Sequence, residues 1–176
     1  MPKRCDDIPT CPAVRQATAD LYAAERDDLF RYLVSSGVEP AQAQDVTQEA
    51  FLRLYSALRD GADIRSPKGW IYRVAHNLAV DSFLRDRRLT TISDPVSSAL
   101  ATLENNERDL IEKDWLENVR RAVGQLSRQQ RACLELRARG LQYSEIAAVL
   151  KIRTSTVGEF LRRGIKQVKQ WNRCLR

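Results

Sequence analysis

Apolar residues recur at helical spacing along this chain, and the scarcity of helix breakers between them constrains the fold more than any other feature. The 176 residues include only 7 Gly and 6 Pro, whereas 30% of them are charged. A sandwich of short strands would need many more turn residues, and amphipathic helices place charged residues on their solvent faces. With 43% hydrophobic residues available to build a core, the pattern predicts an all-α protein.

The first part of the chain contains three amphipathic segments with recognisable ends. The segment Asp20–Ser36 carries apolar residues at helical spacing. Pro40 opens a second segment that stops at Gly61, because proline is tolerated at the first helical position. Ser66 is placed to cap a third segment that runs to about Arg87. Three such helices bury their stripes by packing together as a small bundle.

The helical pattern breaks after Arg88. Residues 89–106 are rich in Ser and Thr, contain Pro95 and lack sustained periodicity, so we interpret them as a linker. A second helical domain starts near Glu107. The predicted organisation is a tail at residues 1–18, a helical domain at 19–88, the linker at 89–106 and a second helical domain at 107–176.

The second domain has the pattern of a helix-turn-helix. Residues from Ser127 to Gln130 have the spacing of a capping box and open a helix. After a glycine turn, Ser144 and Glu145 are expected to cap a second helix, and Thr154 a third. The residues expected to face inward are Ile146, Ala147 and Leu150, followed by Val157, Leu161, Ile165 and Val168. Two helices joined by a turn of a few residues are typical of this motif.

Charge is distributed unevenly between the two parts. From Leu126 to Arg176 there are twelve Lys and Arg against three Asp and Glu, a net charge of +9. The rest of the chain therefore carries −3 of the total of +6. A compact basic segment favours a polyanion as its partner, most often a nucleic acid. The alternative is a basic surface that only solvates the domain.

The last helix has the residue types of a DNA reader. In a helix-turn-helix the second helix of the motif lies in the major groove and presents its N-terminal half to base edges. Arginine can donate two hydrogen bonds to guanine, and glutamate can accept one from cytosine although it repels phosphates. The candidate base-reading residues are Thr154, Ser155, Thr156, Glu159, Arg162 and Arg163. Lys151, Arg153, Lys166 and Lys169 are candidate phosphate contacts, which add affinity without sequence information.

Two helical faces of the first domain are candidate binding surfaces. Spacings of three and four place Asp45, Gln48, Glu49 and Leu52 on one face, which suits a basic partner helix unless it is ordinary solvent-facing surface. The third helix interleaves basic, amide and aromatic residues, a combination suited to single-stranded nucleic acid. Its candidate contacts are Arg73, His76, Asn77, Asp81 and Arg85. Trp70 is expected in the core rather than as a stacking platform.

Several stretches of these helices resemble one family. Residues 45–55 (DVTQEAFLRLY) and 70–81 (WIYRVAHNLAVD) resemble conserved region 2 of bacterial sigma-70-type factors. Residues 126–131 (LSRQQR), 140–147 (GLQYSEIA) and 156–163 resemble region 4. The two regions follow in order with a short linker and no room for an intervening domain, an arrangement similar to the extracytoplasmic-function (ECF) group.

The resemblance implies a transcription initiation factor that binds core RNA polymerase and directs it to promoter DNA. It assigns docking on the polymerase clamp helices to Asp45, Gln48, Glu49 and Leu52. It assigns the promoter −10 element, with a flipped base, to Asn77 and its neighbours Arg73, His76, Asp81 and Arg85. It further implies that the last helix reads the −35 element and that an anti-sigma factor holds the protein inactive. Family members commonly show Gly-Thr-Val-Lys-Ser where this chain has Ser155-Thr-Val-Gly-Glu159.

Other functions receive less support. A stand-alone helix-turn-helix transcriptional regulator would use residues 20–88 for dimerisation. A DNA-processing enzyme is disfavoured because the chain has one histidine, no compelling carboxylate cluster and no activated nucleophile. The four cysteines, Cys5, Cys11, Cys133 and Cys174, lack the spacing of a zinc site. No secretory signal and no apolar run of about 20 residues is present. We therefore expect a cytoplasmic, non-enzymatic protein without metal, cofactor or stable membrane insertion.

Overall fold

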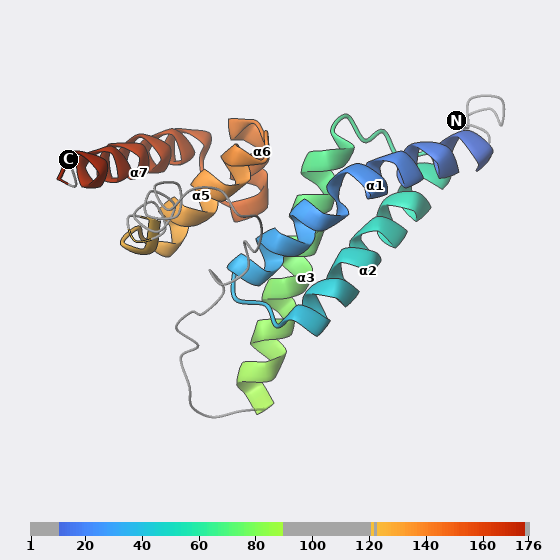
Figure 1. Ribbon diagram of the computed structural model, residues 1–176. Coiled ribbons are helices and arrows are strands. Elements are labelled where there is room, and N and C mark those ends of the chain that lie inside the picture. The colour runs from blue at the N-terminus through green and yellow to red at the C-terminus, as the bar shows by residue number, and fades with distance from the viewer. Residues whose placement is uncertain (1–10, 90–120, 122, 175–176) are drawn as a thin grey trace, which may run out of the picture. The chain divides into compact units, whose positions relative to one another are not determined.

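The computed structural model of this protein describes residues 11–89, 121 and 123–174, and helix is the only regular secondary structure among them (Figure 1). The chain divides into two compact units, Met1–Pro95 and Val96–Arg176. The all-α prediction is confirmed for the described part of the chain. Residues 90–106 of the predicted linker and the predicted start of the second domain lie outside it. None of the described helices is long and apolar enough to cross a membrane.

Three helices pack against one another in the first unit: α1 (Cys11–Ser35), α2 (Pro40–Arg59) and α3 (Pro67–Leu89) (Figure 1). The largest fully buried side chains of this unit are Leu29, Tyr32 and Leu33 of α1, Leu54 of α2, and Ile71 and Tyr72 of α3. The rings of Tyr32 and Tyr72, with centroids 5.6 Å apart, join α1 to α3. The apolar stripes thus meet in one core, as the sequence predicts.

Helix α1 begins at Cys11, well before the predicted start at Asp20. The prediction relied on an apolar stripe, which the first turns of α1 lack. Their sequence, PAVRQATA, consists largely of residues that helices tolerate well, and Pro12 lies in the first turn, where its missing N–H does no harm. Val14 is buried. Helix propensity and the burial of this one side chain account for the additional turns.

Both ends of α2 and the start of α3 follow their predicted local signals. Pro40 occupies the first turn of α2, and the Glu39 carboxylate accepts a hydrogen bond from a backbone N–H of that turn at 3.4 Å. The helix stops before Gly61, whose φ of +80° is a conformation that glycine adopts without strain. The Ser66 hydroxyl accepts a backbone hydrogen bond at the start of α3 at 3.2 Å. Local side-chain chemistry therefore sets these boundaries.

The second unit contains α5 (Arg128–Ala138), α6 (Tyr143–Leu150) and α7 (Thr154–Cys174), and α7 packs against both shorter helices. Its fully buried large side chains are Cys133, Leu136, Leu141, Ile146, Val149 and Val157. Helices α6 and α7 are joined by three residues, which is the connection of a helix-turn-helix. The motif predicted from the sequence is therefore present.

One of the predicted caps in this unit is confirmed and another is wrong. Ser127 and Gln130 form the predicted capping box, with each side chain accepting from the other residue's backbone N–H, at 3.3 and 3.0 Å. Ser144, however, does not cap α6. The Glu145 carboxylate reaches back to the backbone N–H of Gln142 at 2.6 Å, so Gln142 is the N-cap and the helix begins earlier.

The buried face of α7 also differs from the prediction. Val157 and Leu161 are buried, but Ile165 is 44% exposed, and the next buried position is Gly164. A Cβ at Gly164 would lie 3.0 Å from Leu134 Cδ1, so α5 approaches α7 closely there. Glycine is not scored as an apolar residue in a helical pattern. The sequence pattern therefore assigned Ile165, and not Gly164, to the interior. Similarly, Val149 is fully buried in α6, where Leu150 was expected.

Removing the cap at Ser127 should destabilise the second unit. We expect Ser127→Ala to lower its unfolding free energy by about 1 kcal/mol, because a backbone N–H of α5 loses its acceptor. Ser144→Ala is the matched control: the same atom is removed from an exposed serine that caps nothing, and the expected change is below about 0.5 kcal/mol. Urea denaturation of both variants measures the difference, and equal losses would contradict the assignment of Gln142 as N-cap.

Candidate protein and nucleic-acid interfaces

The four residues predicted to dock a partner lie on the side of α2 that the bundle leaves open. Asp45, Gln48 and Leu52 are exposed and Glu49 is half-buried. The opposite side of α2 is buried through Ala43, Val46, Thr47, Ala50, Phe51 and Leu54. Leu52 is 61% exposed, the highest value among the large apolar side chains described. An uncovered leucine beside carboxylates suits a partner helix that offers both apolar and basic side chains.

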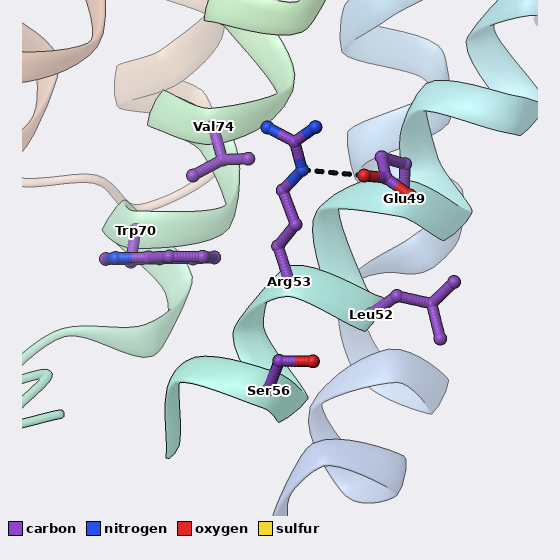
Figure 2. Close-up of a pocket in the computed structure, with 6 residues that line it drawn as sticks. All are labelled: Glu49, Leu52, Arg53, Ser56, Trp70 and Val74. Carbon is purple, nitrogen blue, oxygen red and sulfur yellow. Dashed lines mark hydrogen bonds and ion pairs between the residues drawn. The ribbon is translucent and has the colours of Figure 1, made fainter. Parts of the chain in front are cut away.

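A depression of about 450 Å³ borders this face between α2 and α3. Figure 2 shows the six residues that line it: Glu49, Leu52, Arg53 and Ser56 from α2, and Trp70 and Val74 from α3. The Arg53 Nε donates to Glu49 Oε1 at 2.7 Å. Trp70 is half-buried at the wall of the depression, so it belongs only partly to the core in which it was expected. The sequence prediction missed Arg53 and Ser56, although they continue the spacing of Glu49 and Leu52.

The candidate single-strand contacts on α3 are divided between two environments. Arg73 and Asp81 are exposed and, with the half-buried Asn77, recur every fourth residue along one face. The Asn77 Oδ1 is buried without a hydrogen-bond partner among the described residues. His76 Nδ1 instead lies 2.9 Å from the Tyr32 hydroxyl of α1, so this ring is anchored to the core. The side chain of Arg85 lies outside the described part of the structure.

Most of the candidate base-reading residues of α7 lie on its exposed face. Ser155, Glu159, Arg162 and Arg163 are exposed at spacings that place them together, whereas Val157 and Leu161 are buried on the other side. Thr154, expected as the cap, is the first residue of the helix itself and is exposed, and Thr156 is half-buried. The phosphate candidates Lys151, Arg153, Lys166 and Lys169 are all exposed. Arg163 Nη2 forms an ion pair with Glu159 Oε1.

Two features of the described residues concern metal binding and nucleophilic chemistry. In that part of the chain, no group of three or more His, Cys, Asp or Glu could hold a metal ion. Burial raises the pKa of the Cys133 thiol to about 11, so almost none of it is the nucleophilic thiolate near neutral pH.

Comparison with known proteins identifies the family. Residues 21–89 match the family described as Sigma-70 region 2, and residues 116–168 match Sigma-70, region 4. The ECF RNA polymerase sigma-E factor of Escherichia coli is 30% identical over 135 residues, which cover 71% of each chain. The chain belongs to the ECF group of the sigma-70 family.

The two matched regions of this sigma factor fall on its two structural units. Region 2 covers α2, α3 and most of α1, and region 4 covers α5, α6 and most of α7. The RNA polymerase sigma-H factor of Pseudomonas aeruginosa is 32% identical over 126 residues, covering 66% of this chain and 65% of that protein. SigE of Mycolicibacterium smegmatis is 27% identical over 177 residues, with 68% of its length covered. The chain thus spans about two thirds of the length of these relatives.

Solved structures support the same fold. The Bartonella quintana sigma factor RpoE, in complex with the anti-sigma factor NepR, gives a TM-score of 0.63 at 15% identity, covering 92% of this chain and 99% of that one. CnrH, in complex with the cytosolic domain of CnrY, gives a TM-score of 0.58 at 20% identity, covering 93% and 95%. At these identities the likeness concerns the fold of the sigma factor.

Proposed function

We propose that this ECF sigma factor binds core RNA polymerase and directs it to promoters, without a catalytic centre of its own. The observation that carries the proposal is the pairing, in one chain, of a region 2 bundle with a partly apolar acidic face and a region 4 helix-turn-helix with a basic exposed face. The polymerase supplies the chemistry, and the two modules supply its choice of start site. Such a protein works in the cytoplasm, where polymerase and DNA meet.

The docking surface is the α2 face of Asp45, Gln48, Glu49 and Leu52. Its support is the exposure of Leu52 next to two carboxylates, because a clamp helix can cover the leucine while its basic residues pair with the acids. Asp45 has no ion-pair partner among the described residues, whereas Glu49 is paired with Arg53. Asp45 is therefore the carboxylate most readily available to an incoming cation.

The −10 element is assigned to the face of α3 formed by Arg73, Asn77 and Asp81. Supporting this assignment is Asn77, whose buried Oδ1 has no hydrogen-bond partner among the described residues and can accept from the Watson–Crick edge of an extruded base. Arg73 is exposed and can neutralise the backbone of the displaced strand. The assignment of His76 and Arg85 to the −10 element remains a prediction. The His76 ring is anchored by its contact with the Tyr32 hydroxyl.

The −35 element is assigned to the exposed face of α7. Its support is the co-location of Ser155, Glu159, Arg162 and Arg163 on a helix-turn-helix second helix, with Thr154 and Thr156 at its start. The exposed Lys151 and Arg153 in the preceding turn and Lys166 and Lys169 further along can hold phosphates, which positions the helix on the duplex.

Regulation by an anti-sigma factor forms part of the proposal. The sigma factor RpoE, which has this fold, has been solved in complex with the anti-sigma factor NepR, and CnrH, which also has this fold, in complex with the cytosolic domain of CnrY. A partner that covers Leu52 and its neighbours would compete directly with the polymerase. The uncovered apolar side chain gives such a partner a site to occupy.

Reconstitution with purified core polymerase tests the proposed function. We expect the protein to produce transcription starts on a genomic fragment library that core polymerase alone does not produce, and sequencing of the transcripts maps them. The absence of any new start would overturn the proposal. Binding of duplex DNA by the free protein, without any association with polymerase, would instead indicate a stand-alone helix-turn-helix regulator.

A further inference from the structure

Glu159 is a carboxylate on the exposed face of α7 that is assigned to the −35 element, although the other charged residues of this helix are basic. Glu159 is the only acidic residue of Thr154–Cys174, and among the residues of this helix whose exposure the structure describes, the exposed basic ones are Arg162, Arg163, Lys166 and Lys169. A carboxylate near a phosphate backbone weakens binding to DNA. A carboxylate in the first turn of a helix stabilises its N-terminus, but Glu159 lies in the second turn of α7. Its presence on this face therefore needs another explanation.

Glu145 shows how another acid of this unit is used. Its carboxylate accepts the Gln142 backbone N–H and closes the start of α6, which is a role in folding. Glu159 accepts no such backbone bond; its Oε1 pairs with Nη2 of Arg163, one turn along the same helix. Both side chains are largely in solvent, 45% and 61% exposed. Exposed pairs at this spacing contribute little to helix stability, so the pair is not explained by folding.

Two adjacent arginines of α7, Arg162 and Arg163, differ in their ion pairing. Arg163 is held by Glu159, while Arg162 has no ion-pair partner among the described residues. A free arginine side chain can reach base edges or phosphates, and only base contacts carry sequence information. A guanidinium has five N–H donors in a fixed plane, so one bond to Glu159 leaves enough for a two-donor contact with guanine. The adjacent negative charge at the same time weakens its attraction to phosphates.

We propose that Glu159 is a positioning residue that holds Arg163 toward base edges and away from the phosphate backbone, and so raises the promoter selectivity of α7. The inference rests on the proposed function, since it requires α7 to read the −35 duplex. It assigns to Glu159 a selectivity effect that acts through Arg163 and not through a direct base contact. Removing the carboxylate should therefore strengthen binding to unrelated DNA while weakening discrimination.

The test uses holoenzyme reconstituted with the full chain and two duplexes. One is the promoter fragment that gives the strongest new start in the reconstitution, and the other carries a scrambled −35 segment. We expect Glu159→Ala to reduce the ratio of the two affinities by about two- to fivefold, the range that an exposed ion pair can contribute to positioning a side chain. Binding to the scrambled duplex should tighten, and its salt dependence should steepen by about one phosphate contact. Glu159→Gln, which keeps an acceptor oxygen, should retain more of the ratio.

Two further variants separate positioning from general charge. Glu135→Gln removes the same charge from α5 of the same unit and should leave the ratio unchanged. In an Arg163→Ala background, Glu159→Ala should have no further effect on the ratio, because the residue through which it acts is gone. Equal changes on both duplexes for Glu159→Ala would overturn the inference while leaving the proposed function intact. A wild-type holoenzyme that does not distinguish the duplexes would overturn the −35 assignment and the inference with it.

Discussion

Reversing the charge of two carboxylates on α2 should strongly weaken docking to core RNA polymerase. We expect Asp45→Arg together with Glu49→Arg to weaken the complex on the order of 100-fold, because two attractions to a basic clamp helix become repulsions. Arg53 contributes to the effect: it now pairs with Glu49 and would face a like charge after the reversal. Surface-based binding kinetics with immobilised core enzyme measure the loss.

The control reverses two other acids of the same unit. Asp20 and Asp27 are exposed on α1, so Asp20→Arg with Asp27→Arg changes the net charge equally at a different face. This variant should bind polymerase with an affinity within about threefold of that of the wild type, because its charges lie away from the proposed interface. Thermal unfolding of both variants checks that the bundle survives. Undiminished binding by the α2 variant would show that this face is not the docking surface.

A charge buried on the inner face of α7 should unfold the second unit. Val157 is fully buried in α7, and Val157→Asp places a carboxylate without a partner among apolar side chains. The expected penalty of about 3–5 kcal/mol is comparable with the whole folding free energy of so small a unit. We expect loss of dispersed amide resonances from α5, α6 and α7, loss of −35 selectivity, and retention of the signals from α1 to α3.

Ile165→Asp provides the comparison on the same helix. Its side chain is 44% exposed, so the carboxylate remains in water and the unit should stay folded, with a change in unfolding free energy below about 1 kcal/mol. The apolar pattern alone predicts a similar penalty at both positions, because it places both residues inside. A folded Val157→Asp variant, or an unfolded Ile165→Asp variant, would contradict the packing of α7 described above.

Several helix starts were predictable because local groups set them, although the start of α1 was not. Pro40, Ser66 and the Ser127 capping box mark helix starts in both sequence and structure. The prediction failed at Ser144, because the Glu145 carboxylate accepts the backbone N–H of Gln142 and Gln142 is the N-cap.

The candidate binding faces were predictable in outline only. Helical spacing placed Asp45, Gln48 and Leu52 on one exposed face, but it did not reveal the depression that Trp70 completes from a different helix. Spacing likewise grouped His76 with Asn77, although the Tyr32 hydroxyl on α1 anchors the His76 ring to the core. Contacts between helices distant in sequence decide these details.

The sequence by itself determined the helical class, the helix-turn-helix and the division of charge between the two parts, because periodicity, caps and net charge depend on neighbours along the chain. Only the tertiary structure decided that Gly164 rather than Ile165 faces α5 and that Trp70 borders a depression. Burial and pairing depend on which helices meet and how closely, and those distances arise only when the side chains pack together.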